Sequence, residues 1–155
     1  MSRAFVKEQD DAPETLLERP VSPNPNFVTA RGLKLIEEAL HAAREELARA
    51  QREGDKAMAA RASRDLRYWS QRRASAQMVD PPAAHGKVAF ATAVTILRED
   101  GRRQRFAIVG EDEADPAHGS IAYSSPVARA LLGRSKGDFA ELPGGDAEIT
   151  GIETA

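Results

Sequence analysis

Two runs of residues with coiled-coil spacing constrain the fold of this chain more than any other feature. The core positions of the first run alternate by three and four residues: Leu33, Ile36, Leu40, Ala43, Leu47 and Ala50. The second run has the same spacing: Ala59, Ala62, Leu66, Trp69, Arg73 and Ala76. Between them, Gly54 ends one helix and Asp55 caps the next, so the two helices must run antiparallel. With Thr29 as the first N-cap, the sequence predicts a helical hairpin at residues 27–80.

The residues after Pro81-Pro82 follow a strand-like pattern instead. Asp100-Gly101 is a strong β-hairpin signal between two segments rich in β-branched residues. Ser125-Pro126 begins a short helix that Gly133 ends. The expected strands are 87–97, 103–110, 120–123, 139–142 and 148–152, and the expected helix is 127–132. Together they predict a small antiparallel sheet packed by one helix at residues 84–155, which makes the whole chain α+β.

Residues 1–26 are acidic and end in a proline-rich stretch, which disfavours a helix. We expect a flexible leader here, with a strand or clip that pins onto a partner as the alternative. The absence of Cys excludes disulfides and thiol chemistry. We expect neither a membrane span nor a secretory signal, and therefore a cytoplasmic protein. The net charge is −2 and no basic face stands out, so any contact with nucleic acid should be indirect or weak.

Four short motifs in the second half of the chain resemble one known family. They are IVGEDEAD at 108–115, SSPVARALLG at 124–133, KGD at 136–138 and PGG at 143–145. Their order is similar to that in the C-terminal domain of the GreA/GreB transcription elongation factors, and residues 64–80 resemble the closing arm of a GreB-type hairpin. The resemblance implies an FKBP-like fold for the sheet domain and core RNA polymerase as partner, contacted at the rim of its secondary channel. It also implies partner-binding residues around the Ser-Pro turn: Ser124, Ser125, Pro126, Val127 and Arg129.

The end of the hairpin departs from the family pattern. The family carries GD-x-x-E-N-x-E-Y there, and its acids help hold a catalytic Mg²⁺ in the polymerase. Gly54-Asp55 matches the opening, but Met58 and Arg61 stand at the two Glu positions. Glu53 and Asp55 are the only remaining acidic candidates at this end, and Asp55 is most simply an N-cap. Each arm also looks shorter by about ten residues, or roughly 15 Å of reach.

The sequence therefore predicts a polymerase-binding elongation regulator that does not stimulate transcript cleavage. An active cleavage cofactor using Glu53 and Asp55 is the alternative, as is an interaction module resembling the Gre-like nucleoside diphosphate kinase regulators. We expect a monomer that is not an enzyme and holds no metal or cofactor.

Two charged segments allow more than one interpretation. The acidic residues 111–115 lack the spacing of a Ca²⁺ loop, and we expect a solvated loop that faces a basic partner. Five arginines of the second helix could form a functional stripe or could pair with glutamates of the first helix, and the sequence favours neither. They are Arg61, Arg64, Arg67, Arg72 and Arg73.

Overall fold

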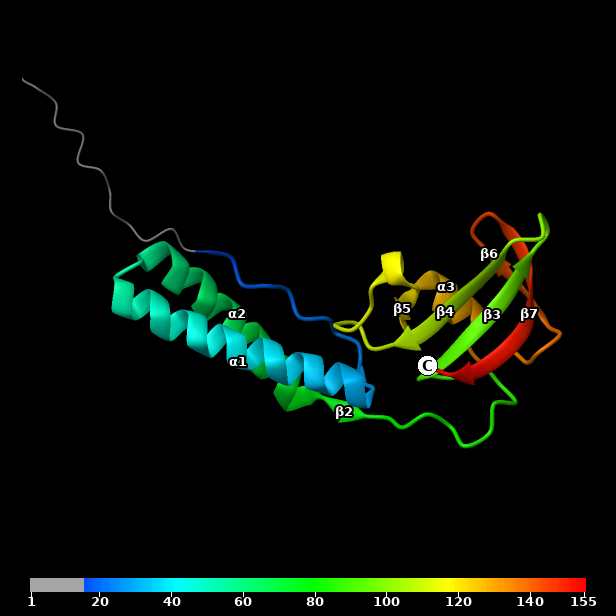
Figure 1. Ribbon diagram of the computed structural model, residues 1–155, viewed down its shortest axis with the longest axis horizontal. Helices are drawn as coiled ribbons and strands as arrows, with labels where there is room; N and C mark the ends of the chain where they lie inside the picture. Colours follow the sequence, from blue (N-terminus) through cyan, green and yellow to red (C-terminus); the bar gives the residue numbers. More distant parts are fainter. Residues whose placement is uncertain (1–15) are drawn as a thin grey trace, which may run out of the picture.

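The computed structural model describes residues 16–155, which form a two-helix hairpin and a small sheet domain (Figure 1). Helix α1 spans Ala30–Glu53 and α2 spans Lys56–Ser75, and the two run antiparallel. The Thr29 hydroxyl accepts a hydrogen bond from the Gly32 N–H and so caps α1. The predicted helical hairpin is confirmed.

The seam between the helices follows the predicted spacing except at the end of α2. Its buried members are Ile36, Leu40, Ala43, Ala50 and Ala62. Near the sheet domain the sequence pattern placed Arg73 in the seam, but that residue is exposed and Arg72 is buried instead. The reason is a partner outside the hairpin, the Asp112 carboxylate, which binds the Arg72 guanidinium.

A short parallel pair of strands closes the base of the hairpin. Strand β1, Phe27–Val28, lies beside β2, Gln77–Met78. The Gln77 N–H donates to the Asn26 carbonyl and the Val79 N–H donates to the Val28 carbonyl, both at 2.9 Å. The sequence pattern did not indicate these strands, because two residues are too few to show an alternation.

The sheet domain has five strands in the order β5-β4-β3-β7-β6. Their bounds are β3 Thr92–Arg98, β4 Arg103–Val109, β5 Ser120–Ala122, β6 Phe139–Leu142 and β7 Gly145–Thr154. A 3-10 turn, η1, spans Pro116–His118, and helix α3 spans Pro126–Leu131. The α+β class is confirmed, with one correction to the expected antiparallel sheet. Strand β5 pairs with β4 in parallel, because residues 110–119 carry the chain back along β4 before β5 begins.

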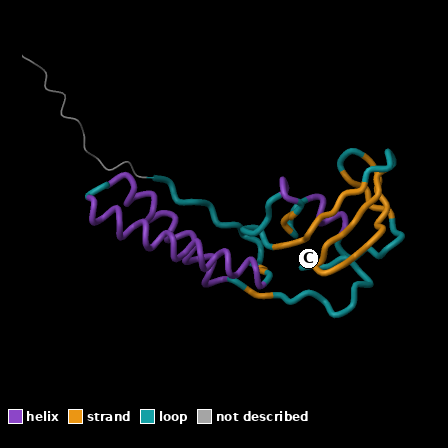
Figure 2. The backbone as a smooth tube through the Cα atoms, viewed as in Figure 1, coloured by secondary structure: helices purple, strands orange, loops and turns teal. Residues whose placement is uncertain are grey.

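The core of this domain lies between the sheet and α3. Its largest fully buried members are Val94, Ile96, Ile108, Leu131 and Ile149. Figure 2 shows the strands of the sheet domain gathered at one end of the molecule and the two long helices at the other. The strand expected at 87–97 begins only at Thr92, because Ala91 has a left-handed backbone with φ of 65°.

Residues 16–26 run along α2 toward the base of the hairpin (Figure 1). We call this segment the N-terminal strap. Residues 1–15 lie outside the described residues, so the flexible leader stays a prediction there, as do the boundaries 27–80 and 84–155. No helix in residues 16–155 combines the length and the hydropathy that a membrane crossing requires.

Candidate functional site

The free end of the hairpin is one candidate site, and it carries both predicted acidic residues. Glu53 is the last residue of α1, and Asp55 directly precedes α2. Both are exposed. The Asp55 carboxylate accepts a hydrogen bond of 3.0 Å from the Met58 N–H, and Gly54 adopts the left-handed conformation at φ of 66°. Asp55 therefore acts as the N-cap of α2, as the sequence predicted.

The charge at this end is unfavourable for a metal ion. Residues 49–61 carry two carboxylates, Glu53 and Asp55. Four cations of the same segment are exposed around them: Arg49, Arg52, Lys56 and Arg61. Magnesium and calcium require several oxygen ligands that converge on one point. Among residues 16–155, no group of three or more acidic or histidine side chains is placed to hold a metal ion.

The Ser-Pro turn is the second candidate site. The Ser125 hydroxyl accepts from the Ala128 N–H at 3.3 Å, which caps α3, and Pro126 is the first residue of that helix. Pro126 and Arg129 are exposed, whereas Ser124 is half-buried. Val127 packs against the core cluster. Of the five predicted residues, the structure thus exposes two to solvent and uses Ser125 and Val127 to anchor the turn.

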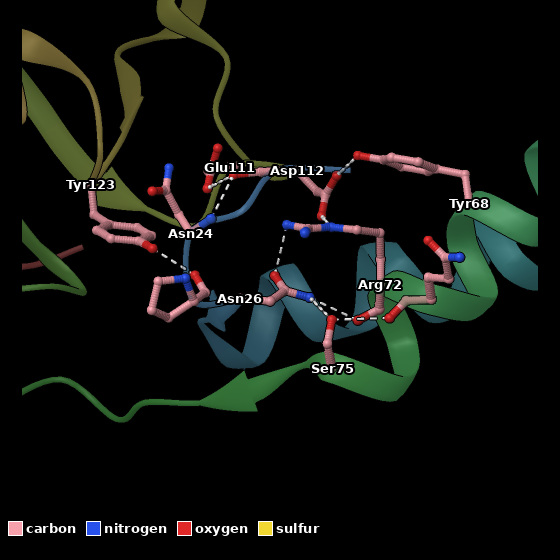
Figure 3. Close-up of polar contacts among 11 residues, drawn as sticks. Asn24, Asn26, Tyr68, Arg72, Ser75, Glu111, Asp112 and Tyr123 are labelled. Carbon is pink, nitrogen blue, oxygen red and sulfur yellow. Dashed lines mark hydrogen bonds and ion pairs between the residues drawn. The ribbon is translucent and has the colours of Figure 1, made fainter. Parts of the chain in front are cut away.

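Tyr123, which precedes this turn, joins the sheet domain to the strap. Its hydroxyl donates to the Pro25 carbonyl oxygen at 2.6 Å (Figure 3). Its ring centroid lies 5.4 Å from that of Phe27 and 5.9 Å from that of Phe90. Burial raises the pKa of Tyr123, and the Glu111 carboxylate adds to this effect. The Ser-Pro turn is therefore tied to the base of the hairpin through an aromatic contact.

The central contact between the two parts is made by Asp112. Its carboxylate accepts 2.5 Å hydrogen bonds from the Arg72 guanidinium and from the Tyr68 hydroxyl (Figure 3). Arg72 also donates to the Asn26 side-chain oxygen at 2.9 Å. Burial, and then the hydrogen bond to Asp112, raise the pKa of Tyr68 to about 12. Sequence reasoning missed this cluster; the only signal was the pairing of Tyr68 and Arg72 four residues apart, on one face of α2.

The neighbours of Asp112 are also engaged. We call Glu111, Asp112 and Glu113 the acidic turn. The Ser22 hydroxyl donates to Glu111 at 2.9 Å, and the Thr29 hydroxyl donates to Glu113. The expectation of a solvated loop facing a basic partner is wrong for these three residues, because their carboxylates are bound by the strap and the hairpin.

Gly110 allows the acidic turn to lie close to the hairpin. This residue is buried directly after β4. A Cβ atom at Gly110 would collide with the backbone carbonyl oxygen of Phe27. The position therefore requires a residue without a side chain, for reasons of space rather than of backbone angle.

The arginines of α2 do not form a free stripe. Arg72 is buried against Asp112, and Arg73 donates to Glu37 of α1 at 3.0 Å. The three others differ in their surroundings: Arg64 contacts Asp65, Arg67 binds Glu18, and Arg61 is exposed. Only the Arg73 contact matches the expected pairing with a glutamate of the first helix.

The strap is bound to α2 by charged and aromatic contacts. Glu18 accepts three hydrogen bonds from Arg67, which lower the pKa of Glu18. The Arg19 guanidinium carbon lies 3.9 Å from the centroid of the Tyr68 ring and 5.3 Å from that of Trp69. Stacking of a cation on aromatic faces is attractive and adds to the contact.

The fold and these contacts define a two-helix hairpin held against a small α+β domain. Residues 83–154 match the family model described as "Transcription elongation factor, GreA/GreB, C-term". This part of the chain is therefore similar to the C-terminal domain of the GreA/GreB family.

Curated relatives match about half of the chain. The GreA elongation factor of Helicobacter pylori is 44% identical over 80 residues, covering 49% of each chain. GreA of Alkalilimnicola ehrlichii is 44% identical over 84 residues, covering 51% of this chain and 53% of its own. The chain thus spans about half the length of the curated relatives it matches.

Two solved structures align with more of the chain but at low similarity. GreA factor homolog 1 of Thermus thermophilus is 19% identical, with 84% of this chain and 99% of its own covered at a TM-score of 0.41. GreA/GreB from Nitrosomonas europaea is 20% identical, with 82% and 98% covered at a TM-score of 0.39.

Proposed function

We propose that this chain is an elongation regulator of the GreA/GreB type that binds RNA polymerase at its secondary channel and does not stimulate transcript cleavage. The C-terminal family match supports the general class. The residues at the hairpin end support the proposal that the chain does not stimulate transcript cleavage. It has only two acids among four exposed cations, and the Asp55 carboxylate already caps α2. The chain acts on the polymerase as a monomer and is not itself an enzyme.

The sheet domain provides the proposed docking surface. The resemblance assigns the rim contact to Ser124, Ser125, Pro126, Val127 and Arg129. The capped start of α3 is a rigid support for such a contact, because Ala128 and Leu131 anchor the helix in the core. Pro126 and Arg129 are the exposed members, so they supply most of the proposed interaction.

The hairpin would then occupy the entrance of the channel. Helix α1 has 24 residues and is therefore about 36 Å long. A positively charged end without converging carboxylates has no means of recruiting a second Mg²⁺. Occupancy of the channel, rather than chemistry at the hairpin end, would modulate elongation and exclude other channel-binding factors.

A cleavage assay on stalled, backtracked polymerase complexes tests this proposal. We expect the protein to co-elute with core polymerase and to leave the RNA 3′ end intact, while a cleavage-competent GreA shortens it. RNA shortening that is abolished by Asp55→Ala would replace the proposal with the active-cofactor alternative. Failure to co-elute would instead favour an interaction module with a different partner.

A further inference from the structure

The acidic turn binds the hairpin part through three different segments. Glu111 accepts from Ser22 of the strap, Asp112 accepts from α2, and Glu113 accepts from Thr29 at the start of α1. We infer that the acidic turn is an internal docking site that fixes the direction in which the hairpin leaves the sheet domain. Arg72 and Asp112 are its positioning residues. This inference concerns the free chain and does not depend on the polymerase proposal.

The covalent connection between the two parts does not fix this direction. After β2 the chain reaches the sheet domain through an irregular segment that arcs away from both parts (Figure 1). Most of residues 80–87 are exposed, including Pro81 and Lys87. An exposed segment of this length tolerates many relative orientations. The orientation must therefore be set by non-covalent contacts between the two parts.

The acidic turn itself is rigid enough for this role. It follows β4 directly, and the N–H groups of Glu113 and Ala114 both donate to the Gly110 carbonyl, at 3.2 and 3.1 Å. Gly110 in turn lies against the backbone of Phe27. The three carboxylates are thus held on a tight turn that directly follows the end of β4.

The Arg72–Asp112 pair is buried and fully bonded. The Arg72 side chain is 2% exposed and that of Asp112 is 9% exposed. Asn26 accepts from the Arg72 guanidinium and donates to the Arg72 backbone carbonyl at 2.8 Å. No buried side-chain nitrogen or oxygen in residues 16–155 lacks a hydrogen-bond partner. Because rotation of the hairpin would leave buried charges unpaired, a network of this kind favours one geometry.

A second contact prevents rotation about the first. Tyr123 binds the Pro25 carbonyl and packs against Phe27. In Figure 3, Tyr123 and Arg72 lie on opposite sides of Asn24 and Asn26. With the Ser22–Glu111 and Thr29–Glu113 hydrogen bonds, these separate attachments define a direction, whereas a single one would act as a pivot. As a consequence, the hairpin end and the Ser-Pro turn are held at a fixed separation.

Pulsed dipolar spectroscopy between two spin labels tests this inference on the full chain. The protein has no Cys, so labels attach only at introduced positions. Glu53→Cys labels the hairpin end and Glu141→Cys labels β6; both residues are exposed. We expect one narrow distance distribution, and a broadened or shifted distribution after Asp112→Asn or Arg72→Gln.

A matched control uses the next acid along the chain. Asp115 is exposed and its side chain pairs with His118, so Asp115→Asn should leave the distribution unchanged. A second label pair, at Glu99 and Glu141, reports on the sheet domain alone and should keep its distance in every variant. Glu113→Gln leaves the buried pair intact and provides a milder test if Arg72→Gln does not fold.

Two results would overturn the inference. One is a hairpin-to-sheet distribution that is identical in Asp112→Asn, Glu113→Gln and the unsubstituted protein. The other is an equal change in the Glu99–Glu141 distance, because the acidic turn would then support the fold of the sheet domain rather than the direction of the hairpin.

Discussion

Burial distinguishes two kinds of ion pair in this chain. The Arg72 Nε atom lies 2.5 Å from Asp112 Oδ2, and both side chains are almost fully buried. The Lys34 Nζ atom lies 3.8 Å from Glu38 Oε1, and 75% and 59% of these side chains are exposed. Removing one partner of a buried pair costs about 3–5 kcal/mol, because the other charge is left without water or a partner. An exposed pair on a helix contributes about 0.3–0.5 kcal/mol.

The pKa of Tyr68 offers a direct measure of the buried cluster. Burial and the hydrogen bond to Asp112 raise this pKa to about 12. Asp112→Asn removes the adjacent negative charge, so the pKa should fall toward its ordinary value of about 10. The measurement is an alkaline titration of phenolate absorbance in a Tyr123→Phe background, since the chain has two tyrosines.

The same shift has a consequence for stability. The folded state favours the neutral phenol, so the contribution of Tyr68 is complete below pH of about 10 and is lost as the pH rises toward about 12. Thermal unfolding of Tyr68→Phe should therefore depend less on pH in this window.

In the alkaline titration, an unchanged phenolate midpoint in Asp112→Asn would contradict the assignment of the hydrogen bond between Tyr68 and Asp112.

Single residues with local partners were predictable from the sequence. Thr29, Asp55 and Ser125 each cap a helix by accepting from an N–H three residues ahead. Asp100-Gly101 joins β3 and β4 as expected, with Gly101 at φ of 84°. These signals depend on neighbours within the same turn, so the composition of a few adjacent residues determines them.

The contact between the two parts was not predictable in this way. Arg72 and Asp112 are 40 residues apart in the chain. The heptad pattern favoured Arg73 for the seam, and no local rule states that acids following β4 turn toward a helix. For the same reason the β5 segment was recognised as a strand, but its parallel pairing with β4 was not.

At the scale of the elements, the outer half of the N-terminal strap is attached by partly exposed charged contacts. Its outer half is bound by Glu18–Arg67, with side chains 61% and 53% exposed, and by Arg19, whose side chain is 35% exposed. Exposed ion pairs are weak and are screened by salt. Residues nearer the hairpin base are better protected, since Asn26 is buried. The outer half should therefore detach before the rest of the strap.

The emission of the single tryptophan, Trp69, reports on this detachment, because Arg19 lies near its ring. High salt should detach the outer half of the strap and shift the Trp69 emission. Arg19→Ala should produce the same shift in emission without added salt. The matched control is Arg31→Ala, since Arg31 is exposed at the start of α1. Emission that is the same in Arg19→Ala and the unsubstituted protein at low salt would show that the strap does not rest on Trp69 in solution.

At the scale of the whole molecule, the two candidate sites lie on different parts. The hairpin end is at one extreme, and the Ser-Pro turn is on the sheet domain (Figure 1). If both contact one large partner, each contact raises the effective concentration of the other. The affinity then depends on the separation between the sites as well as on their side chains.

Pro126→Asp should weaken the proposed binding to core polymerase by about tenfold or more, equivalent to about 1.4 kcal/mol. Pro126 is exposed, so the substitution places a charge in the contact without disturbing the core. Pro116→Asp is the matched control, because Pro116 is also an exposed proline at the first position of a helical turn. Titration with core polymerase should give a weaker affinity for Pro126→Asp than for Pro116→Asp. Equal affinities of the two variants would refute the assigned contact.

The position of the acidic turn along the chain has a consequence for biosynthesis. The hairpin is formed from neighbouring segments and is complete by residue 78, whereas Asp112 is translated later. Chains emerge from the ribosome with the N-terminal part first. Newly made α2 must therefore present Arg72 to water until the end of β4 appears, so the nascent hairpin acquires its orientation only late in synthesis.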